Sequence, residues 1–320
     1  MFLRKGNNAY VVKIFAPLFV LYICLTVSGC TKNYSTESTT VPPPQTLDSM
    51  SYQFNAFGIQ SMRTGEFMAL WVKITPDTAW RFVSILTLRY RYPDDSVLLV
   101  GKFYNNKPID SLKDVIITLE QTTKPQTPGL LLAHARVFLL DSAKTHMSIS
   151  LDARPVLGDF SLLQGSLVFT SPLPDTTAYT HELYLMNFQG SQQTPSLLSL
   201  NQLPAGWKYG VWAVDTNFTP HESFFYGLFT SPQGHDNDSA NDHYPYPGGW
   251  KPQRMDVAGG SIIVTLEPEF YGDSLKFKAP SPFILLEFKR IRNILKNNNY
   301  PMKNVSVNTI PSGIITFRKD

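Results

Sequence analysis

The stretch Ser-Ile-Ile-Val-Thr-Leu, at residues 261–266, decides the fold class, because aliphatic and β-branched residues run through it without glycine, proline or charge. Three further stretches have the same strand length and composition, at residues 67–73, 97–103 and 115–119. The 24 prolines of the chain disfavour long helices, and after the N-terminal segment only residues 288–297 have a spacing that permits one. The sequence therefore predicts an all-β protein of antiparallel sheets packed face to face.

Four short landmarks occur twice in the same order. The first set is Trp71-Val72-Lys73, Val100-Gly101-Lys102-Phe103, Ile116-Ile117-Thr118-Leu119-Glu120 and Pro128-Gly129-Leu130-Leu131-Leu132. The second set is Trp212-Ala213-Val214, Tyr226-Gly227-Leu228-Phe229, Ile263-Val264-Thr265-Leu266-Glu267 and Pro282-Phe283-Ile284-Leu285-Leu286. The matches predict two tandem, related Ig-like β-sandwich domains, at residues 49–152 and 153–320. Chance similarity between all-β sequences is the alternative.

Residues 1–29 have the pattern of a lipoprotein signal peptide. Three basic residues precede a hydrophobic stretch from Ile14 to Val27, which is short for a membrane span, and a Ser-Gly dipeptide leads into Cys30. We expect cleavage before Cys30, which then carries a diacylglyceryl group and an acyl chain such as palmitate. An uncleaved anchor helix is the alternative interpretation.

Residues 30–48 are polar and contain three consecutive prolines, a composition typical of a disordered, flexible tether. The expected reach of such a chain is roughly 20 to 25 Å. We therefore expect a protein held at the cell membrane by the lipid on Cys30 and facing the periplasm or the cell surface. Thr31 stands where an aspartate would indicate the inner membrane, which favours the outer membrane.

The charge of the mature chain argues against a nucleic-acid partner. The formal net charge of +3 equals the three basic side chains of residues 1–29, which contain no acidic residue, so cleavage leaves a chain close to neutral. The two cysteines are Cys24, inside the signal, and Cys30. No thiol pair is then left for an intramolecular disulfide, and the fold depends on its hydrophobic core.

The second set of landmarks resembles a known family. The residues that carry the resemblance are Leu-Pro-Ala-Gly-Trp-Lys-Tyr-Gly-Val-Trp-Ala-Val at 203–214, Gly-Leu-Phe at 227–229 and Ile-Val-Thr-Leu-Glu-Pro at 263–268. They are similar to the extracytoplasmic domain of anti-sigma-K-type factors, which also occurs in tandem in uncharacterised lipoproteins of Bacteroidetes-like bacteria. The resemblance implies a β-sandwich outside the cytoplasm and no catalytic residues. Such factors hold their sigma factor with a cytoplasmic helical segment, for which about thirteen residues before the hydrophobic stretch leave no room, so we expect no direct sigma-factor binding.

Aromatic and polar side chains of the C-terminal half supply the candidates for binding. An aromatic and proline-rich passage can form an exposed contact surface, although large rings in strands more often fill a core. The candidate partner-binding residues are Trp207, Tyr209, His235, Tyr244, Tyr246 and Trp250. Metal ligation is a weaker hypothesis for the same region, because Ala240 and Asn241 break the pattern of a calcium loop. Its candidate ligands are His235, Asp236, Asp238, Asp242 and His243.

Catalytic signatures are missing from the sequence. No Gly-x-Ser-x-Gly occurs, and Glu120 and Glu267 belong to different repeats, which speaks against a pair of acid–base carboxylates. We expect a protein without enzymatic activity or cofactor that binds or scaffolds an unknown envelope protein or glycan. The alternatives are a regulatory or sensory component related to anti-sigma factors and an envelope carbohydrate-active enzyme.

Overall fold

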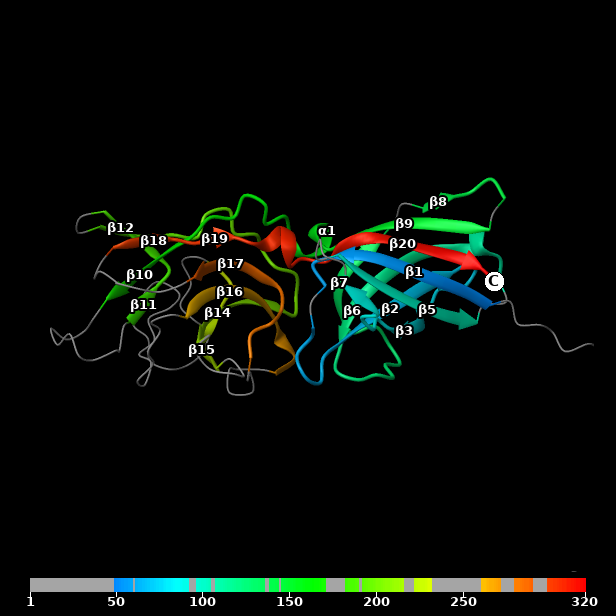
Figure 1. The fold of residues 1–320 in the computed structure, drawn as a ribbon, viewed down its shortest axis with the longest axis horizontal. Helices are drawn as coiled ribbons and strands as arrows, with labels where there is room; N and C mark the ends of the chain where they lie inside the picture. The colour runs from blue at the N-terminus through cyan, green and yellow to red at the C-terminus, as the bar shows by residue number, and fades with distance from the viewer. Residues whose placement is uncertain are drawn as a thin grey trace, which may run out of the picture. The chain divides into compact units, whose positions relative to one another are not determined.

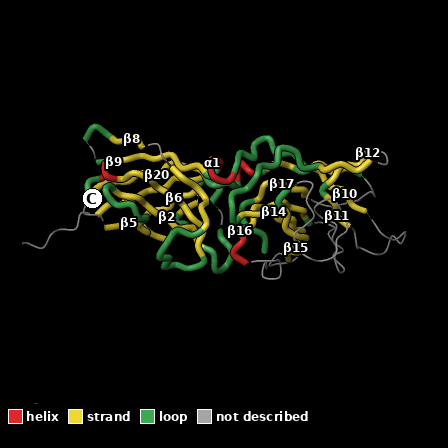
Figure 2. The backbone as a smooth tube through the Cα atoms, turned by 180° about the vertical axis from the view of Figure 1, so that it is seen from behind, coloured by secondary structure: helices red, strands yellow, loops and turns green. Residues whose placement is uncertain are grey.

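The strands of the protein build antiparallel sheets, which confirms the predicted all-β class (Figures 1 and 2). The computed structural model describes residues 49–59, 61–91, 96–104, 107–135, 138–143, 145–170, 182–189, 192–215, 222–231, 260–271, 279–289 and 298–320. The predicted signal peptide, Cys30 and the predicted tether lie outside the described residues. Residues 46–320 form one compact unit.

The largest sheet has ten strands in the order β3-β2-β6-β7-β9-β20-β1-β5-β4, with β8 paired to β9 beside this path. We call it the N-terminal sheet. Its strands are β1 (Ser49–Phe57), β2 (Phe67–Ile74), β3 (Arg81–Ile85), β4 (Tyr90–Arg91), β5 (Val97–Tyr104), β6 (Leu112–Glu120), β7 (Leu130–Ala135), β8 (Phe138–Leu140), β9 (His146–Asp152) and β20 (Ser312–Lys319). The three strands predicted at residues 67–73, 97–103 and 115–119 are confirmed as β2, β5 and β6.

The last strand of the chain lies in the middle of the N-terminal sheet. β20 pairs with β1 from Met50↔Lys319 to Phe57↔Ser312, and on its other side it pairs with β9 (Figure 1). Residues 312–319 therefore belong to the same sheet as the N-terminal strands. The predicted range 153–320 includes these residues in the second domain, whereas their strand pairs with strands of the first predicted domain.

The remaining strands form a five-stranded sheet, in the order β15-β14-β16-β17-β19, and two small sheets, β11-β10-β18 and β12-β13. We call the five-stranded sheet the C-terminal sheet. These strands are β10 (Ser166–Thr170), β11 (Glu182–Tyr184), β12 (Met186–Gln189), β13 (Gln192–Pro195), β14 (Trp207–Asp215), β15 (Glu222–Phe229), β16 (Ser261–Pro268), β17 (Ile284–Lys289), β18 (Asn299–Pro301) and β19 (Lys303–Asn304). Helical turns occur at Ile109–Ser111, α1 (Arg154–Leu157), Glu269–Tyr271 and Ser306–Asn308. The helix that the spacing of residues 288–297 permits is not formed at its start, because Phe288 and Lys289 extend β17, and residues 290–297 lie outside the described residues.

Burial on both faces explains why the central strands read as continuous apolar stretches rather than as alternating ones. In β2, Leu70 and Val72 point into the main core, whereas Trp71 packs on the opposite face with Ala69 and Ile116. All eight residues of β16 are buried. A shift of one residue would exchange the two faces of such a strand and place its side chains in packing environments shaped for other side chains.

The pairing order of the N-terminal sheet recurs in the C-terminal sheet. The run β3-β2-β6-β7 has its counterpart in β15-β14-β16-β17. The register is also shared, because Trp71 lies opposite Ile116 and Trp212 lies opposite Ile263. Each isoleucine stands four residues before the glutamate of its motif, Glu120 or Glu267. The landmarks on β2, β6 and β7 therefore match their counterparts in the structure. The landmark on β5 does not, because the partner of β15 in the repeat is β3, the strand that pairs with β2.

Even the irregularities of pairing are repeated. The β2–β3 and β14–β15 ladders shift register directly before Trp71 and Trp212, and the β6–β7 and β16–β17 ladders shift directly before Thr118 and Thr265. A β-bulge bends a strand and re-aims its side chains. Four bulges at matching positions therefore give both tryptophans the same place relative to the threonine and the glutamate that follow.

A buried tryptophan, threonine and glutamate form the polar centre of each repeat. In the first, Trp71 Nε1 donates to Thr118 Oγ1 at 2.8 Å, and Thr118 donates to Glu120. In the second, Trp212 Nε1 and Thr265 Oγ1 both donate to Glu267 Oε1, at 2.8 and 2.5 Å. The two centres therefore differ in what the threonine does.

This difference predicts unequal effects of Thr118→Val and Thr265→Val. Thr118→Val leaves the buried indole N–H of Trp71 without its acceptor and is expected to lower the free energy of unfolding by about 1 to 3 kcal/mol. Thr265→Val leaves the Trp212–Glu267 bond in place and is expected to cost about 0.5 to 1.5 kcal/mol. Urea unfolding of both variants measures the difference, with the exposed Thr64→Val as a control that should change stability by less than about 0.5 kcal/mol. Equal losses at the two positions would contradict the assigned bonds.

Candidate functional site

Two predicted partner-binding residues, Trp207 and Tyr209, lie in the core, which corrects that expectation. Their exposed fractions are 3% and 0%. Trp207 Nε1 donates to the carbonyl oxygen of Leu131 at 3.2 Å, and Tyr209 donates to that of Asn201 at 2.7 Å. Both rings pack against phenylalanines, so neither presents a surface to a ligand.

The other candidates lie outside the described residues. They are Cys30, His235, Asp236, Asp238, Asp242, His243, Tyr244, Tyr246 and Trp250. Within the part of the chain that the structure describes, no group of three or more histidine, cysteine, aspartate or glutamate side chains is placed to hold a metal ion. Partner and metal binding by the 235–250 passage therefore stays a prediction.

The geometry of Glu120 and Glu267 is that of structural acceptors. Glu120 Oε1 accepts the backbone N–H of Gly129 at 2.8 Å, just before β7, and Glu267 Oε1 accepts that of Ser281 at 3.0 Å, before β17. Each carboxylate therefore ties the end of one strand to the loop that leads into the next strand. A methyl group on Gly129 would stand 2.6 Å from Glu120 Oε2, which shows how closely that loop approaches.

A single arginine joins the two repeats at Glu267. Arg63, in the loop before β2, donates to Glu267 Oε2 at 2.7 Å and to the carbonyl oxygen of Ala279 at 3.2 Å. It also pairs with Glu66 at 2.5 Å, and both glutamate side chains are at most 1% exposed. Burial raises the pKa of Glu267, while Arg63 and Thr265 lower it. Burial disfavours the charge on Arg63, yet Glu267 and Glu66 keep its pKa above the ordinary value.

The second repeat makes the reciprocal contact. Gly206 stands directly before β14 and Trp207 is its first residue, and the two reach Leu130 and Leu131 at the start of β7. Gly206 has φ +87°, and a methyl group there would lie 2.6 Å from Leu130 Cδ1. Glu267 and Glu66 therefore serve the contact between the repeats through Arg63, and Glu120 serves the first repeat alone.

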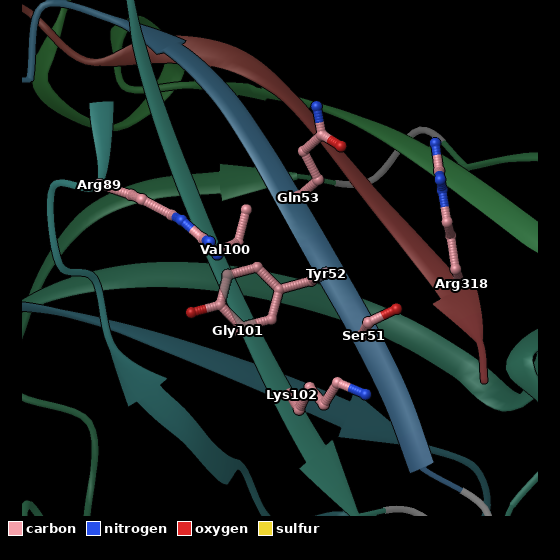
Figure 3. A pocket seen from close by; sticks show the side chains of 8 residues that line it. All are labelled: Ser51, Tyr52, Gln53, Arg89, Val100, Gly101, Lys102 and Arg318. Atoms are coloured by element: carbon pink, nitrogen blue, oxygen red, sulfur yellow. The ribbon is translucent and has the colours of Figure 1, made fainter. Parts of the chain in front are cut away.

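The outer face of the N-terminal sheet carries an open hollow of about 430 Å³ (Figure 3). It is lined by Ser51, Tyr52, Gln53, Arg89, Val100, Gly101, Lys102 and Arg318. Three strands supply its floor, because Ser51 on β1 lies opposite Lys102 on β5 and opposite Arg318 on β20. We call it the basic hollow.

Two cations flank a small residue in this hollow. Lys102 and Arg318 are each one strand away from Ser51, which places their backbones roughly 10 Å apart. The side chains of Arg89, Lys102 and Arg318 are exposed, and Figure 3 shows Arg89 reaching toward Val100 from the loop before β4. The carboxylate of Asp320 lies 3.0 Å from the Lys102 ammonium and is its countercharge.

Tyr52 closes the sheet beneath the hollow. A methyl group on Gly101 would lie 2.5 Å from the Tyr52 ring, so the ring fills the place that a side chain at residue 101 would take. The Tyr52 hydroxyl bonds to Ser84 Oγ at 2.5 Å, and burial raises its pKa. The floor is thus fixed, whereas the cations above it are exposed to solvent.

The chemistry of the basic hollow is that of anion binding. Guanidinium and ammonium groups donate to phosphate, sulfate or carboxylate oxygens, and the Ser51 and Gln53 side chains add neutral donors. No local sequence pattern indicates these residues, because the lining extends from Ser51 to Arg318 along the chain and is brought together by the pairing of β1 with β5 and β20. The alternation Thr316, Phe317, Arg318 is the local sign that Arg318 faces outward.

Comparisons with known proteins found no match to this chain. No family model matches the chain, no curated protein matches it, and no solved structure matches it. Over the described ranges, no helix has the length and apolar character needed to cross a membrane.

The link between the repeats predicts a large loss of stability for Arg63→Met. This substitution leaves two buried carboxylates without their cation, and we expect the free energy of unfolding to fall by about 3 to 5 kcal/mol. Adding Glu267→Gln to Arg63→Met should restore part of the loss, because it removes one uncompensated charge. Urea unfolding is the measurement, with Arg81→Met as a control: the Arg81–Asp77 pair is exposed, and its loss should cost less than about 1 kcal/mol. A loss below about 1 kcal/mol for Arg63→Met would show that the pair does not hold the repeats together.

Proposed function

We propose that the protein is a non-catalytic, lipid-anchored binding protein of the cell envelope, built from two related β-sandwich repeats. In this proposal Cys30 carries the lipid, and the basic hollow receives an anionic group of an envelope partner. The protein binds or scaffolds and performs no chemistry of its own.

The observation that carries the proposal is the contrast between the buried and the exposed charges. Glu66 and Glu267 are buried and share Arg63, whereas Arg89, Lys102 and Arg318 share one exposed face. Buried, paired charges serve the fold, and exposed like charges gathered in a hollow are typical of ligand recognition. The hollow contains no histidine or carboxylate that could act as a base beside a nucleophile.

Lipidation predicts a specific effect of Cys30→Ala. Cells labelled with radioactive palmitate should give labelled wild-type protein and unlabelled Cys30→Ala, because the thiol of residue 30 is the acceptor of the lipid. Cys24→Ala is the matched control, since residue 24 lies in the predicted signal peptide and its loss should leave labelling intact. Labelling of Cys30→Ala at the wild-type level would contradict the anchor.

Occupancy of the hollow in cells is tested by photo-crosslinking. We expect p-benzoylphenylalanine in place of Gln53 to form adducts with an envelope component, and the same group in place of the exposed Gln121 to form none. Arg318→Glu should lower the yield at position 53 by about fivefold, the effect of roughly 1 kcal/mol at an exposed charge. Equal yields at both positions, or a yield at 53 that ignores Arg318→Glu, would overturn the proposed role of the hollow.

A further inference from the structure

The position of the basic hollow relative to the start of the folded chain indicates what occupies it. β1 begins at Ser49, and the hollow residues Ser51 and Gln53 follow two and four positions later. Only residues 31–48 separate Ser49 from Cys30 in the sequence. The hollow therefore lies beside the point where the chain arrives from its predicted lipid anchor.

The cations lie at this same end of the sheet. Ser49 pairs with Tyr104 and Met50 pairs with Lys319, so β5 and β20 both end where β1 begins. Lys102 and Arg318 are each within two residues of those ends. The basic side of the hollow is thus close to the first described residue of the chain.

Acidic groups near the hollow do not cancel its charge. Asp320 pairs with Lys102, and the charged residues among those that line the hollow are Arg89, Lys102 and Arg318, all of them cationic. Asp141, near the start of β9, has a pKa of about 2 because the His146 backbone and Thr145 donate hydrogen bonds to it. Its hydrogen bonds go to those two residues rather than to the hollow, and the Lys102 side chain remains 71% exposed.

The lining of the hollow favours a lipid headgroup over a protein. Interfaces between proteins usually centre on buried aromatic or aliphatic side chains. Val100 is the one aliphatic residue of the lining, and the Tyr52 ring is buried beneath it. An open surface that carries the three cationic side chains of Arg89, Lys102 and Arg318 instead suits the phosphate of a phospholipid.

We infer that the basic hollow docks onto anionic phospholipid headgroups of the membrane in which Cys30 is anchored. This inference rests on the proposed lipid anchor. Anchoring makes the contact intramolecular, so even a weak site is occupied when headgroups lie within reach of the tether. The expected tether reach of roughly 20 to 25 Å provides this proximity. The contact holds the outer face of β1, β5 and β20 against the membrane surface.

The test measures the reactivity of Lys102 in proteoliposomes. Full-length lipidated protein is reconstituted in vesicles of phosphatidylcholine alone or of phosphatidylcholine and phosphatidylglycerol in equal parts. Lysines are acetylated with an N-hydroxysuccinimide ester and quantified by mass spectrometry. We expect Lys102 to react about fivefold more slowly in the anionic vesicles at low salt, while the exposed Lys124 reacts equally in both. The protection should disappear at about 1 M salt, where the screening length is about 3 Å.

A charge-reversed protein supplies the matched control. Arg89→Glu combined with Arg318→Glu should abolish the protection of Lys102, while the lipid keeps the variant on the vesicles and urea unfolding confirms its fold. Equal reactivity of Lys102 in both kinds of vesicle, or protection that survives the double substitution, overturns the headgroup inference. Wild-type protein that does not float with the vesicles overturns the anchor itself. An adduct of position 53 with a protein, together with an unprotected Lys102, overturns only the headgroup inference and leaves the binding function standing.

Discussion

Two carboxylates buried around one arginine are the constraint on which the rest of the structure depends. Glu267 accepts Trp212, Thr265, Ser281 and Arg63, so it ties together β14, the end of β16, the loop before β17 and the loop before β2. A buried charge tolerates no loss of partners, and the pairing of its strands is therefore fixed with it. Glu120 holds the equivalent loop in the first repeat, and no arginine among the described residues forms an ion pair with it. The two repeats therefore differ at this polar centre. In the first repeat its hydrogen bonds stay within the repeat, whereas in the second repeat Glu267 also binds Arg63 of the first.

The charged residues that stabilise the fold differ from those that line the basic hollow in their burial and in their partners. The Arg63 side chain is largely buried, and its three nitrogens donate hydrogen bonds to Glu66, Glu267 and Ala279. Arg318 lies on a strand whose inward neighbour Phe317 is fully buried, so its own position is rigid while its guanidinium remains in solvent. A rigid backbone that presents hydrated cations is suited to weak, reversible and salt-sensitive contacts.

The features that could be predicted from the sequence are those that a short stretch of residues encodes by itself. The strands at residues 261–266 and 115–119 could be predicted because each stretch is largely apolar along its whole length. The repeated Trp, Thr-x-Glu and Pro-initiated landmarks also identify equivalent strands in the two repeats. The glycine landmark fails because the two glycines lie on strands with different partners: Gly101 on β5 lies opposite Tyr52 of β1, whereas Gly227 on β15 lies opposite Val211 of β14 and has φ +145°. Trp207 and Tyr209 look like a binding platform only while their partners Leu131 and Asn201 are unknown. The basic hollow required the pairing of strands from both ends of the chain, and no local pattern encodes that pairing.

The place of β20 has a consequence for how the protein reaches its native state. Because β20 separates β1 from β9, the N-terminal sheet has a gap until the last eight residues have emerged, and the strands that border the gap present unpaired backbone edges. Pairing of residue 50 with residue 319 closes nearly the whole chain into a loop, which is a late and slow event in folding. The N-terminal sheet of a nascent chain therefore stays incomplete until β20 has been synthesised. Such delayed closure is compatible with the proposed export of the chain, because an exported polypeptide crosses the membrane before it becomes compact.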